Sequence, residues 1–409
     1  MEKYQDMRVF CFQHGGEYAQ KVNEEREKRL QGAWAIRFPF EVKGYPAFIV
    51  LNRELHALIA SINQKNVQLV RLSRELPAEA GRQFARNAMV EEIQQSNEFE
   101  NVHSTRREIR EAVEALEQGM GDKRFMGMVK KYSMLLERKD ISLNNSSDIR
   151  RLYDEFILEE VLRENPKNAP DGTVFRRDTN YVSYQGQAIH EGVYPERRVI
   201  ETMDGALLML NDRTIDPLVR AAAFHYAFGY IHPFYDGNGR MSRFITSYVL
   251  SECEYAESAC LRISYIIKNH RQLYQRIFRN ANDPRSMGDL TCFVIEFLRL
   301  IELALEDTYA VLQEKYRAYE HYQARLQECV NRREKALHKY GSVLWLMMQA
   351  KLFGDGYFDV LELAYSCDLS PNTIRRIAGL FPGLIVQERE GNRMMYHLDL
   401  EWLDRAEQG

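Results

Sequence analysis

The residues with the clearest chemical potential run from His232 to Arg243, in the order His-Pro-Phe-Tyr-Asp-Gly-Asn-Gly-Arg-Met-Ser-Arg. The imidazole of His232 has an ordinary pKa near 6.5, so it can accept a proton from a hydroxyl group at neutral pH. Asp236 offers the hard carboxylate oxygen that Mg²⁺ prefers while the ion keeps waters and phosphate oxygens as further ligands. A base and a metal-binding carboxylate in one short segment indicate chemistry on a phosphate.

Two glycines and two arginines complete this segment. Gly237 and Gly239 flank Asn238 at the start of a predicted helix, where successive N–H groups form a concavity that binds anions. Arg240 and Arg243 are three positions apart, so both project from one helical face and can hold further phosphates with forked hydrogen bonds. The pattern predicts in-line attack on a magnesium-bound triphosphate. No G-x-x-x-x-G-K-[ST] pattern occurs, which excludes a P-loop enzyme.

The elements that must position these residues are mostly helical, so we predict a mainly α fold. Helical spacing with few breakers covers the ranges Ile109–Leu116, Phe125–Leu136, Pro217–Ile231 and Arg240–Leu250. The β-like run Ala47–Leu51, followed by a helical repeat from Leu55 to Val67, predicts a small N-terminal cap. The β-prone pairs Tyr181-Val182 and Ala188-Ile189 predict a hairpin just ahead of the catalytic helices.

The last third of the chain predicts a charged helical pair at Leu300–His338, followed by a C-terminal module. In this module, Val360–Cys367 predicts a helix, and Ser370-Pro371 is a strong start signal for a second helix that ends before Pro382-Gly383. A hairpin with its turn at Glu390-Gly391-Asn392 follows. This order predicts a winged helix-turn-helix.

A winged helix can bind duplex DNA, and four arginines could supply the contacts: Arg375, Arg376, Arg389 and Arg393. Glu388 and Glu390 on the same wing reduce the positive potential. Such modules also dock proteins or form dimers, so DNA binding and a homodimer both stay open.

The length of 409 residues exceeds what one core usually holds, so we expect several domains. The predicted boundaries are 1–88 for the N-terminal cap, 89–300 for the catalytic core, 301–339 for a helical connector and 340–409 for the winged helix.

Composition excludes several classes of protein. The net charge of -4 argues against a uniformly nucleic-acid-binding surface, and the six cysteines form no C-x-x-C pair, so neither a zinc cluster nor a disulfide framework is implied. The N-terminus carries no apolar export signal, and no run approaches the roughly 18 to 20 apolar residues of a spanning helix. We therefore expect a cytoplasmic protein without a membrane segment.

The pattern from His232 to Arg243 resembles, at every defined position, the signature of the Fic family, and the likeness extends from Tyr45 through Thr291. The resemblance implies an enzyme that uses ATP and Mg²⁺ and transfers AMP onto a Ser, Thr or Tyr hydroxyl of a target protein, and possible self-modification. Carried over by position, it implies the following roles: His232 as general base, Phe234 packed beneath the loop, Asp236 on Mg²⁺, Gly237, Asn238 and Gly239 around the α and β phosphates, and Arg240 and Arg243 on the β and γ phosphates.

An upstream segment, at about residues 90–101, resembles the inhibitory helix of this family. Ser96 and Glu100-Asn101 match the pattern [ST]-x-x-x-E-[GN], and the two side chains share one helical face. The resemblance implies an ion pair between Glu100 and Arg243, which would deny Arg243 to the γ phosphate and leave ATP in a pose unfit for attack. A plain charged helix is the alternative.

Two further positions follow from the resemblance. The segment Thr179–Tyr194 stands where the family has a β-hairpin flap that pairs with the target backbone, although Pro195 stands alone where a Pro-Pro pair is common. Tyr274 corresponds to a position near the nucleotide base, but an aromatic residue on an apolar helix face is more often part of the core. Other activities also stay open: removal of AMP with Glu100 positioning water, or a DNA-binding regulator whose core only senses nucleotide.

Overall fold

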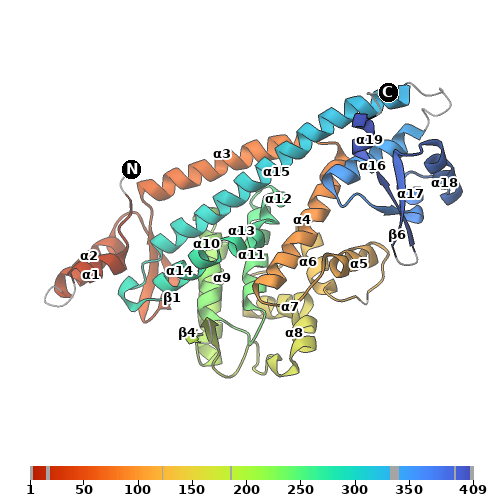
Figure 1. Cartoon of the computed structure of the whole chain (residues 1–409). Coiled ribbons are helices and arrows are strands. Elements are labelled where there is room, and N and C mark those ends of the chain that lie inside the picture. The colour runs from red at the N-terminus through yellow and green to blue at the C-terminus, as the bar shows by residue number, and fades with distance from the viewer. Residues whose placement is uncertain are drawn as a thin grey trace. The chain divides into compact units, whose positions relative to one another are not determined.

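The computed structural model describes residues 3–14, 19–121, 123–184, 187–331, 340–390 and 393–405. The chain divides into two compact units, which we call the core unit (residues 1–67 and 89–306) and the C-terminal unit (residues 68–88 and 307–409). Helices predominate in both, so the predicted mainly α class is confirmed (Figure 1). Within the described residues, every helix is too short or too polar to span a bilayer.

The helices up to the catalytic segment are α1 (Met7–His14), α2 (Ala19–Gln31), α3 (Arg53–Glu75), α4 (Ala78–Phe99), α5 (Arg106–Glu117), α6 (Met126–Leu136), α7 (Ser146–Phe156), α8 (Leu158–Glu164), α9 (Glu196–Asn211) and α10 (Pro217–Ile231). The later ones are α11 (Asn238–Glu252), α12 (Glu257–Cys260), α13 (Ile263–Asn269), α14 (Arg271–Ala281), α15 (Thr291–Asn331), α16 (Gly341–Phe353), α17 (Val360–Ser366), α18 (Pro371–Leu380) and α19 (Leu400–Arg405). Two short 3₁₀ turns lie at Pro166–Asn168 and Pro284–Ser286.

Helix α10 forms the centre of the core unit. Its start is fixed by Pro217 at the first helical position and by Asp216, whose side chain accepts a hydrogen bond from the N–H of Leu218. Nearly all of its side chains are buried, as expected for a helix that is apolar on every face. Helix α10 packs against both α9 and α11, and these contacts fix the position of its end at Ile231 (Figure 1).

Two antiparallel hairpins belong to the core unit. Strand β1 (Ala35–Val42) pairs with β2 (Tyr45–Val50), and the sequence indicated only the second of them because charged residues interrupt the first. Strand β3 (Tyr181–Tyr184) pairs with β4 (Gln187–Glu191), which confirms the hairpin predicted ahead of the catalytic helices. The turn between β3 and β4, at 185–186, lies outside the described residues.

The predicted helical pair at Leu300–His338 is wrong for the described part of that range. One helix, α15, runs without a break from Thr291 to Asn331, because this stretch contains no glycine or proline that would end it. Residues 332–339 lie outside the described residues. The predicted domain boundaries stay a prediction.

The C-terminal unit ends in helices followed by a small sheet, in the order that the sequence predicted. Helices α16, α17 and α18 are followed by β6 (Ile385–Glu390) and β7 (Arg393–Leu398), and the short strand β5 (Phe358–Asp359) completes a sheet in the order β5-β7-β6. As predicted, Ser370 caps α18 by accepting a hydrogen bond from the N–H of Thr373. The predicted turn at Glu390-Gly391-Asn392 falls largely outside the described residues.

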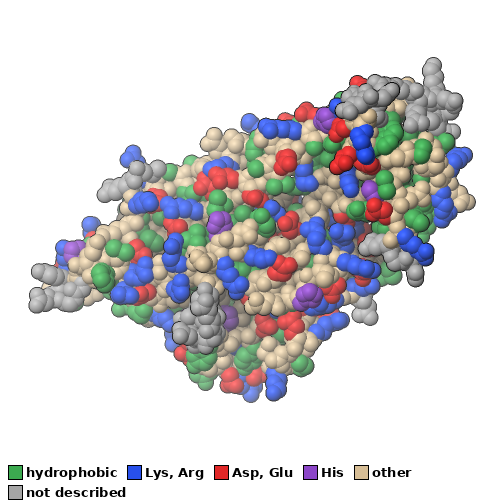
Figure 2. Space-filling view, in the orientation of Figure 1, with side chains coloured by type: hydrophobic (Ala, Val, Ile, Leu, Met, Phe, Trp, Pro, Cys, Tyr) green, Lys and Arg blue, Asp and Glu red, His purple; other side chains and the backbone are tan. Residues whose placement is uncertain are grey.

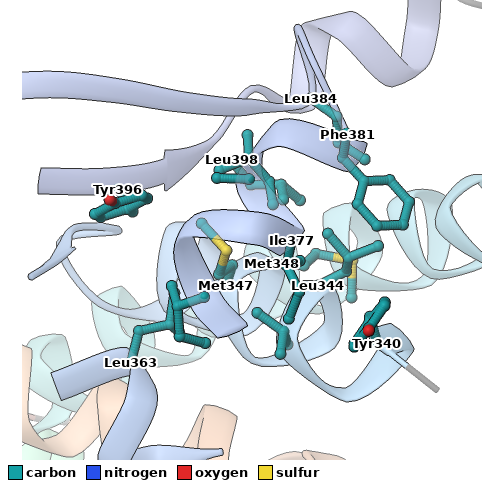
Figure 3. Packing of buried hydrophobic residues seen from close by; sticks show 14 of the residues in the cluster. Tyr340, Leu344, Met347, Met348, Leu363, Ile377, Phe381, Leu384, Tyr396 and Leu398 are labelled. Atoms are coloured by element: carbon teal, nitrogen blue, oxygen red, sulfur yellow. The ribbon is translucent and has the colours of Figure 1, made fainter. Parts of the chain in front are cut away.

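Apolar side chains from these helices and strands converge on one core (Figure 3). The labelled members are Tyr340, Leu344, Met347, Met348, Leu363, Ile377, Phe381, Leu384, Tyr396 and Leu398. The unit therefore has a hydrophobic centre of its own.

Candidate active site

His232 lies at the end of α10 in a left-handed backbone conformation (φ 53°), and its N–H donates to the carbonyl oxygen of Phe228 at 2.9 Å. The side chain keeps some solvent access, yet burial lowers its pKa to about 3, with smaller contributions from His190 and Arg176. The imidazole is therefore neutral at neutral pH, as a proton acceptor must be. It is also a weaker base than the ordinary pKa near 6.5 suggested from the sequence.

The loop after His232 is braced from within. The side chain of Asn238 accepts a hydrogen bond from the N–H of Phe234 at 3.0 Å and donates one to its carbonyl oxygen at 2.7 Å. The ring of Phe234 is fully buried and stacks on Tyr153 at 3.7 Å. Phe234 thus packs beneath the loop as expected, whereas the Asn238 side chain is already bonded and leaves only its main-chain N–H for a phosphate.

The start of α11 has the features of an anion site. Gly237 takes a left-handed conformation (φ 81°), and no side chain of the described residues caps the helix. The first helical hydrogen bond runs from the N–H of Met241 to Gly237, so the N–H groups of Asn238, Gly239 and Arg240 have no partner inside the helix. These three groups can bind an anion.

Arg240 is fully buried and has spare hydrogen-bond donors. Its Nη2 lies 3.4 Å from a carboxylate oxygen of Asp236, and its Nη1 lies 3.9 Å from Glu164. Its Nε and Nη1 nevertheless have no hydrogen-bond partner among the described residues. Buried donors without a partner are rare, because each costs free energy, and a phosphate would satisfy them.

Arg243 is also fully buried, but all three nitrogens of its guanidinium donate to residues at the end of α4. Its Nη1 donates to Glu100 at 2.8 Å, and its Nη2 donates to the carbonyl oxygen of Ser96 at 2.9 Å. The hydroxyl of Ser96 accepts from both Nε and Nη2 at 3.1 Å. The structure thus forms the ion pair between Glu100 and Arg243 that the resemblance implied, and Ser96 adds hydrogen bonds to the same guanidinium.

The end of α4 explains why the pattern requires asparagine or glycine after the glutamate. Asn101 adopts a left-handed conformation (φ 61°), which asparagine and glycine tolerate best. The N–H of Asn101 donates to Glu98 at 3.1 Å, and the N–H of Val102 donates to Asn97 at 2.9 Å. These bonds form a Schellman motif in which Glu100 is the C-cap residue. The motif therefore ends the helix and aims Glu100 at α11.

The carboxylate of Glu100 lies directly against Gly239. A β-carbon placed on Gly239 would overlap Oε1 of Glu100 and approach Nη1 of Arg243 to 3.0 Å. A negative charge is favourable beside the N-terminus of a helix. Glu100 therefore supplies an anion at the place that the sequence assigns to phosphate.

Asp236 is the residue expected to hold Mg²⁺. Its carboxylate accepts the N–H of Gly237, which fixes one of its oxygens beside the anion site. Among the described residues there is no cluster of three or more metal-ligating side chains. The single carboxylate of Asp236 beside an anion site fits Mg²⁺, which is usually held by one or two carboxylates together with waters and substrate phosphates.

The predicted base-binding residue Tyr274 is part of the core. Its hydroxyl is hydrogen-bonded to Nε2 of His225 at 2.8 Å, and its ring packs edge-on against Phe99 at 5.8 Å. Burial lowers the pKa of His225 to about 3, so this histidine is neutral. The position favours the core alternative that the sequence left open for Tyr274.

Sequence reasoning missed two residues that the structure brings to this region, Arg176 and Glu92. Both are fully buried, and Glu92 accepts hydrogen bonds from Ser264 across 172 positions of sequence. A single charged residue carries no sequence pattern of its own, so only an alignment of relatives could have indicated them.

The arginines proposed for DNA contact have different surroundings. Arg375 is exposed on α18, whereas Arg376 donates to the hydroxyl of Tyr340 at 2.6 Å within its own unit. Arg393 lies 3.9 Å from Asp359, and Arg389 is exposed. Basic and acidic side chains are interspersed over the face shown in Figure 2.

Comparisons with known proteins agree with this geometry. The model of the Fic/DOC family matches residues 143–250. Protein adenylyltransferase fic-1 of Caenorhabditis elegans is 34% identical over 112 residues, which are 26% of this chain and 21% of the relative. Protein adenylyltransferase Fic of Drosophila melanogaster is 32% identical over 124 residues, 30% of this chain and 23% of the relative. The chain therefore spans only 21% and 23% of the length of these curated relatives.

A solved structure extends the likeness beyond this segment. The crystal structure of a Fic family protein from Desulfovibrio desulfuricans G20 covers 86% of this chain and 97% of its own, with a TM-score of 0.52 and 21% sequence identity. At this identity the likeness concerns the fold alone.

Proposed function

Since residues 143–250 form a Fic domain, we propose that this chain is a protein adenylyltransferase held in a slow state by its own Glu100. It would transfer AMP from ATP to a Ser, Thr or Tyr hydroxyl of a target protein and of itself. The observation that carries the proposal is the carboxylate of Glu100, which lies against Gly239 and is paired with Arg243.

The neutral imidazole of His232 would take the proton from the attacking hydroxyl. The hydroxyl oxygen then bonds to the α-phosphorus as the bond from that phosphorus to pyrophosphate breaks. The N–H groups at the start of α11 and the free donors of Arg240 would hold the phosphates. Mg²⁺, held by Asp236, would neutralise phosphate charge when bound.

The slow state follows from competition for one guanidinium. A phosphate can bind Arg243 only after Glu100 releases it, and the helix N-terminus beside Gly239 must exchange one anion for another. If ATP binds while Glu100 stays, the γ phosphate lacks its arginine and the α phosphate is misplaced for in-line attack. A displacement of about 1 Å at the reacting atoms can cost on the order of 100-fold in rate.

The test is transfer of AMP followed by mass spectrometry. Wild type, Glu100→Gly and the double variant Glu100→Gly/His232→Ala are each incubated with Mg²⁺ and ATP. Self-labelling should be strongest for Glu100→Gly and absent from the double variant. Equal labelling of wild type and Glu100→Gly would remove the inhibitory role, and undiminished labelling without His232 would remove its role as base.

The reverse reaction is a second candidate, because Glu100 lies beside the proposed phosphate site, where a carboxylate could orient water. A protein that already carries labelled AMP distinguishes the two activities. Release that requires Glu100 favours the reverse reaction, release unaffected by Glu100→Gly excludes Glu100 as the residue that orients water, and absence of release by wild type excludes the reverse reaction.

Duplex DNA is the partner that we propose for the C-terminal unit, on the basis of its helix-turn-helix order and the exposed Arg375 on α18. Leu361 and Tyr365 on α17 are 64% and 91% exposed and would instead suit a protein partner or a second copy. A salt-sensitive gel shift that Arg375→Ala weakens supports DNA. If duplex DNA is not shifted at low salt and the protein sediments as a dimer, self-association would replace DNA binding as the role proposed for this unit.

A further inference from the structure

Arg176 lies on the segment that leads into the flap, residues 179–194, and its side chain is fully buried. All of its side-chain hydrogen bonds within the described residues go to main-chain carbonyl oxygens. The acceptors are His232 at 2.8 Å, Val193 at 2.8 Å, Ile231 at 3.4 Å and Asp178. A buried charge that pairs with no carboxylate costs free energy. Its presence here indicates that the buried carbonyl groups need the hydrogen-bond donors that Arg176 supplies.

Two of the four carbonyl groups belong to the end of the helix that carries His232. The last carbonyl groups of a helix have no donor inside it, and a cation is favourable at that end. Ile231 also accepts the N–H of Val193 at 3.0 Å, and Tyr230 accepts the ring N–H of His190 at 2.7 Å. Arg176 and the flap therefore supply the missing donors at the end of α10.

The backbone of the flap also lies against His232 itself. A β-carbon on Gly192 would lie 3.1 Å from Cβ of His232 and 3.0 Å from the carbonyl oxygen of Ile231, and it would meet Nη2 of Arg176 at 2.5 Å. Glycine is needed here because of close approach. Any shift of the flap at Gly192 would therefore press on His232 or on its capping arginine.

We propose that Arg176 is a positioning residue, which fixes the orientation of His232 by capping α10 and ties that orientation to the flap. This rests on the proposed function only in taking His232 as the base. Arg176 should act on the chemical step and leave nucleotide binding intact, because its contacts are at the end of α10, whereas Gly239, Arg240 and Arg243 belong to α11.

The test combines kinetics with the resonances of His232. Arg176→Lys and Gly192→Ala are each introduced into Glu100→Gly, and self-labelling gives kcat and the KM for ATP. The kcat should fall by about tenfold or more while KM changes less than about twofold. Arg197→Lys is the matched control, since Arg197 is exposed on α9 and bonds only Glu201 among the described residues.

A second readout does not depend on activity. In protein with ¹⁵N-labelled histidines, Arg176→Lys should shift or broaden the imidazole signals of His232, assigned with His232→Ala, while those of His225 stay in place. His225 is the internal control because it is buried earlier in α10.

The outcomes separate this proposal from the proposed function. An unchanged kcat with unchanged His232 signals overturns the role of Arg176. Joint loss of ATP affinity and of the His225 signals also overturns it, because that result describes a general packing role. If Glu100→Gly transfers no AMP, the proposed function fails, and the histidine signals still decide the role of Arg176.

Discussion

The two arginines of α11 have the same burial and opposite hydrogen bonding. Arg243 donates to Ser96 and Glu100 through all three of its nitrogens, whereas Arg240 leaves Nε and Nη1 without a partner. Helix α4 therefore closes one side of the anion site and leaves the other open. In the proposed function, inhibition would therefore act through Arg243, while Arg240 keeps donors available for a phosphate.

The two sides should therefore contribute differently to binding and to rate. A phosphate on Arg240 gains hydrogen bonds without breaking any, because the donors are already desolvated and free. A phosphate on Arg243 must first replace a carboxylate of similar charge. We expect Arg240 to set the affinity for nucleotide and the contact between Arg243 and Glu100 to set the rate of transfer.

Substitution of Arg240 should have the largest effect, on the affinity for nucleotide. Arg240→Ala removes a charged donor set, and hydrogen bonds to charged groups contribute about 1.5 to 3 kcal/mol each, so the Kd for Mg²⁺-ATP should rise by roughly 100-fold. Calorimetric titration measures it. Arg240→Lys keeps the charge but lacks the planar guanidinium, so its Kd should lie between those of wild type and Arg240→Ala. A Kd equal to that of wild type would show that the open donors do not face the nucleotide.

The stabilisation that Glu92 contributes to the fold, from helix α4, should depend on pH. Burial raises the pKa of Glu92 to about 7, and its carboxylate accepts the N–H and hydroxyl of Ser264. The folded protein thus binds this proton more tightly than the unfolded chain does. The resulting stabilisation is fully present below the ordinary pKa of glutamate and is lost as pH rises through 7.

Between pH 5 and 8, wild type should therefore lose about 2 kcal/mol of unfolding free energy relative to Glu92→Gln. Urea denaturation at several pH values measures this difference. Glu75→Gln, at an exposed carboxylate, is the control and should follow the wild-type profile. Parallel profiles for wild type and Glu92→Gln would show that Glu92 does not titrate in this range.

Removal of the Ser96 hydroxyl should have a smaller effect, on the rate of self-labelling. Ser96→Ala removes two contacts to Arg243 but leaves the carbonyl oxygen of Ser96 and the carboxylate of Glu100 in place. A net loss of about 0.5 to 1 kcal/mol should raise self-labelling roughly threefold. Ser147→Ala, at an exposed serine of α7, should change nothing. An activation as large as that of Glu100→Gly would mean that the serine holds the arginine.

Sequence could predict what lies close together along the chain. His232 to Arg243 form one contiguous segment, and Ser96 and Glu100 share a helical face, so spacing indicated each of these two groups. The pairing of Glu100 with Arg243 followed from the family resemblance. Sequence could not predict that the Asn238 side chain would brace the loop, because this depends on the path of the backbone around Phe234. Arg176 is also invisible in sequence, since its acceptors are carbonyl groups that any residue would provide.

In the proposed function, Glu100 slows transfer through its contact with Arg243. The most direct measurement is the activation caused by Glu100→Gly with Arg243 present and in an Arg243→Ala background, read as the ratio of self-labelling rates. We expect activation of about tenfold or more with Arg243 present and a ratio near one without it. Equal activation in both backgrounds would contradict it, because Glu100 would then act without the arginine it is paired with.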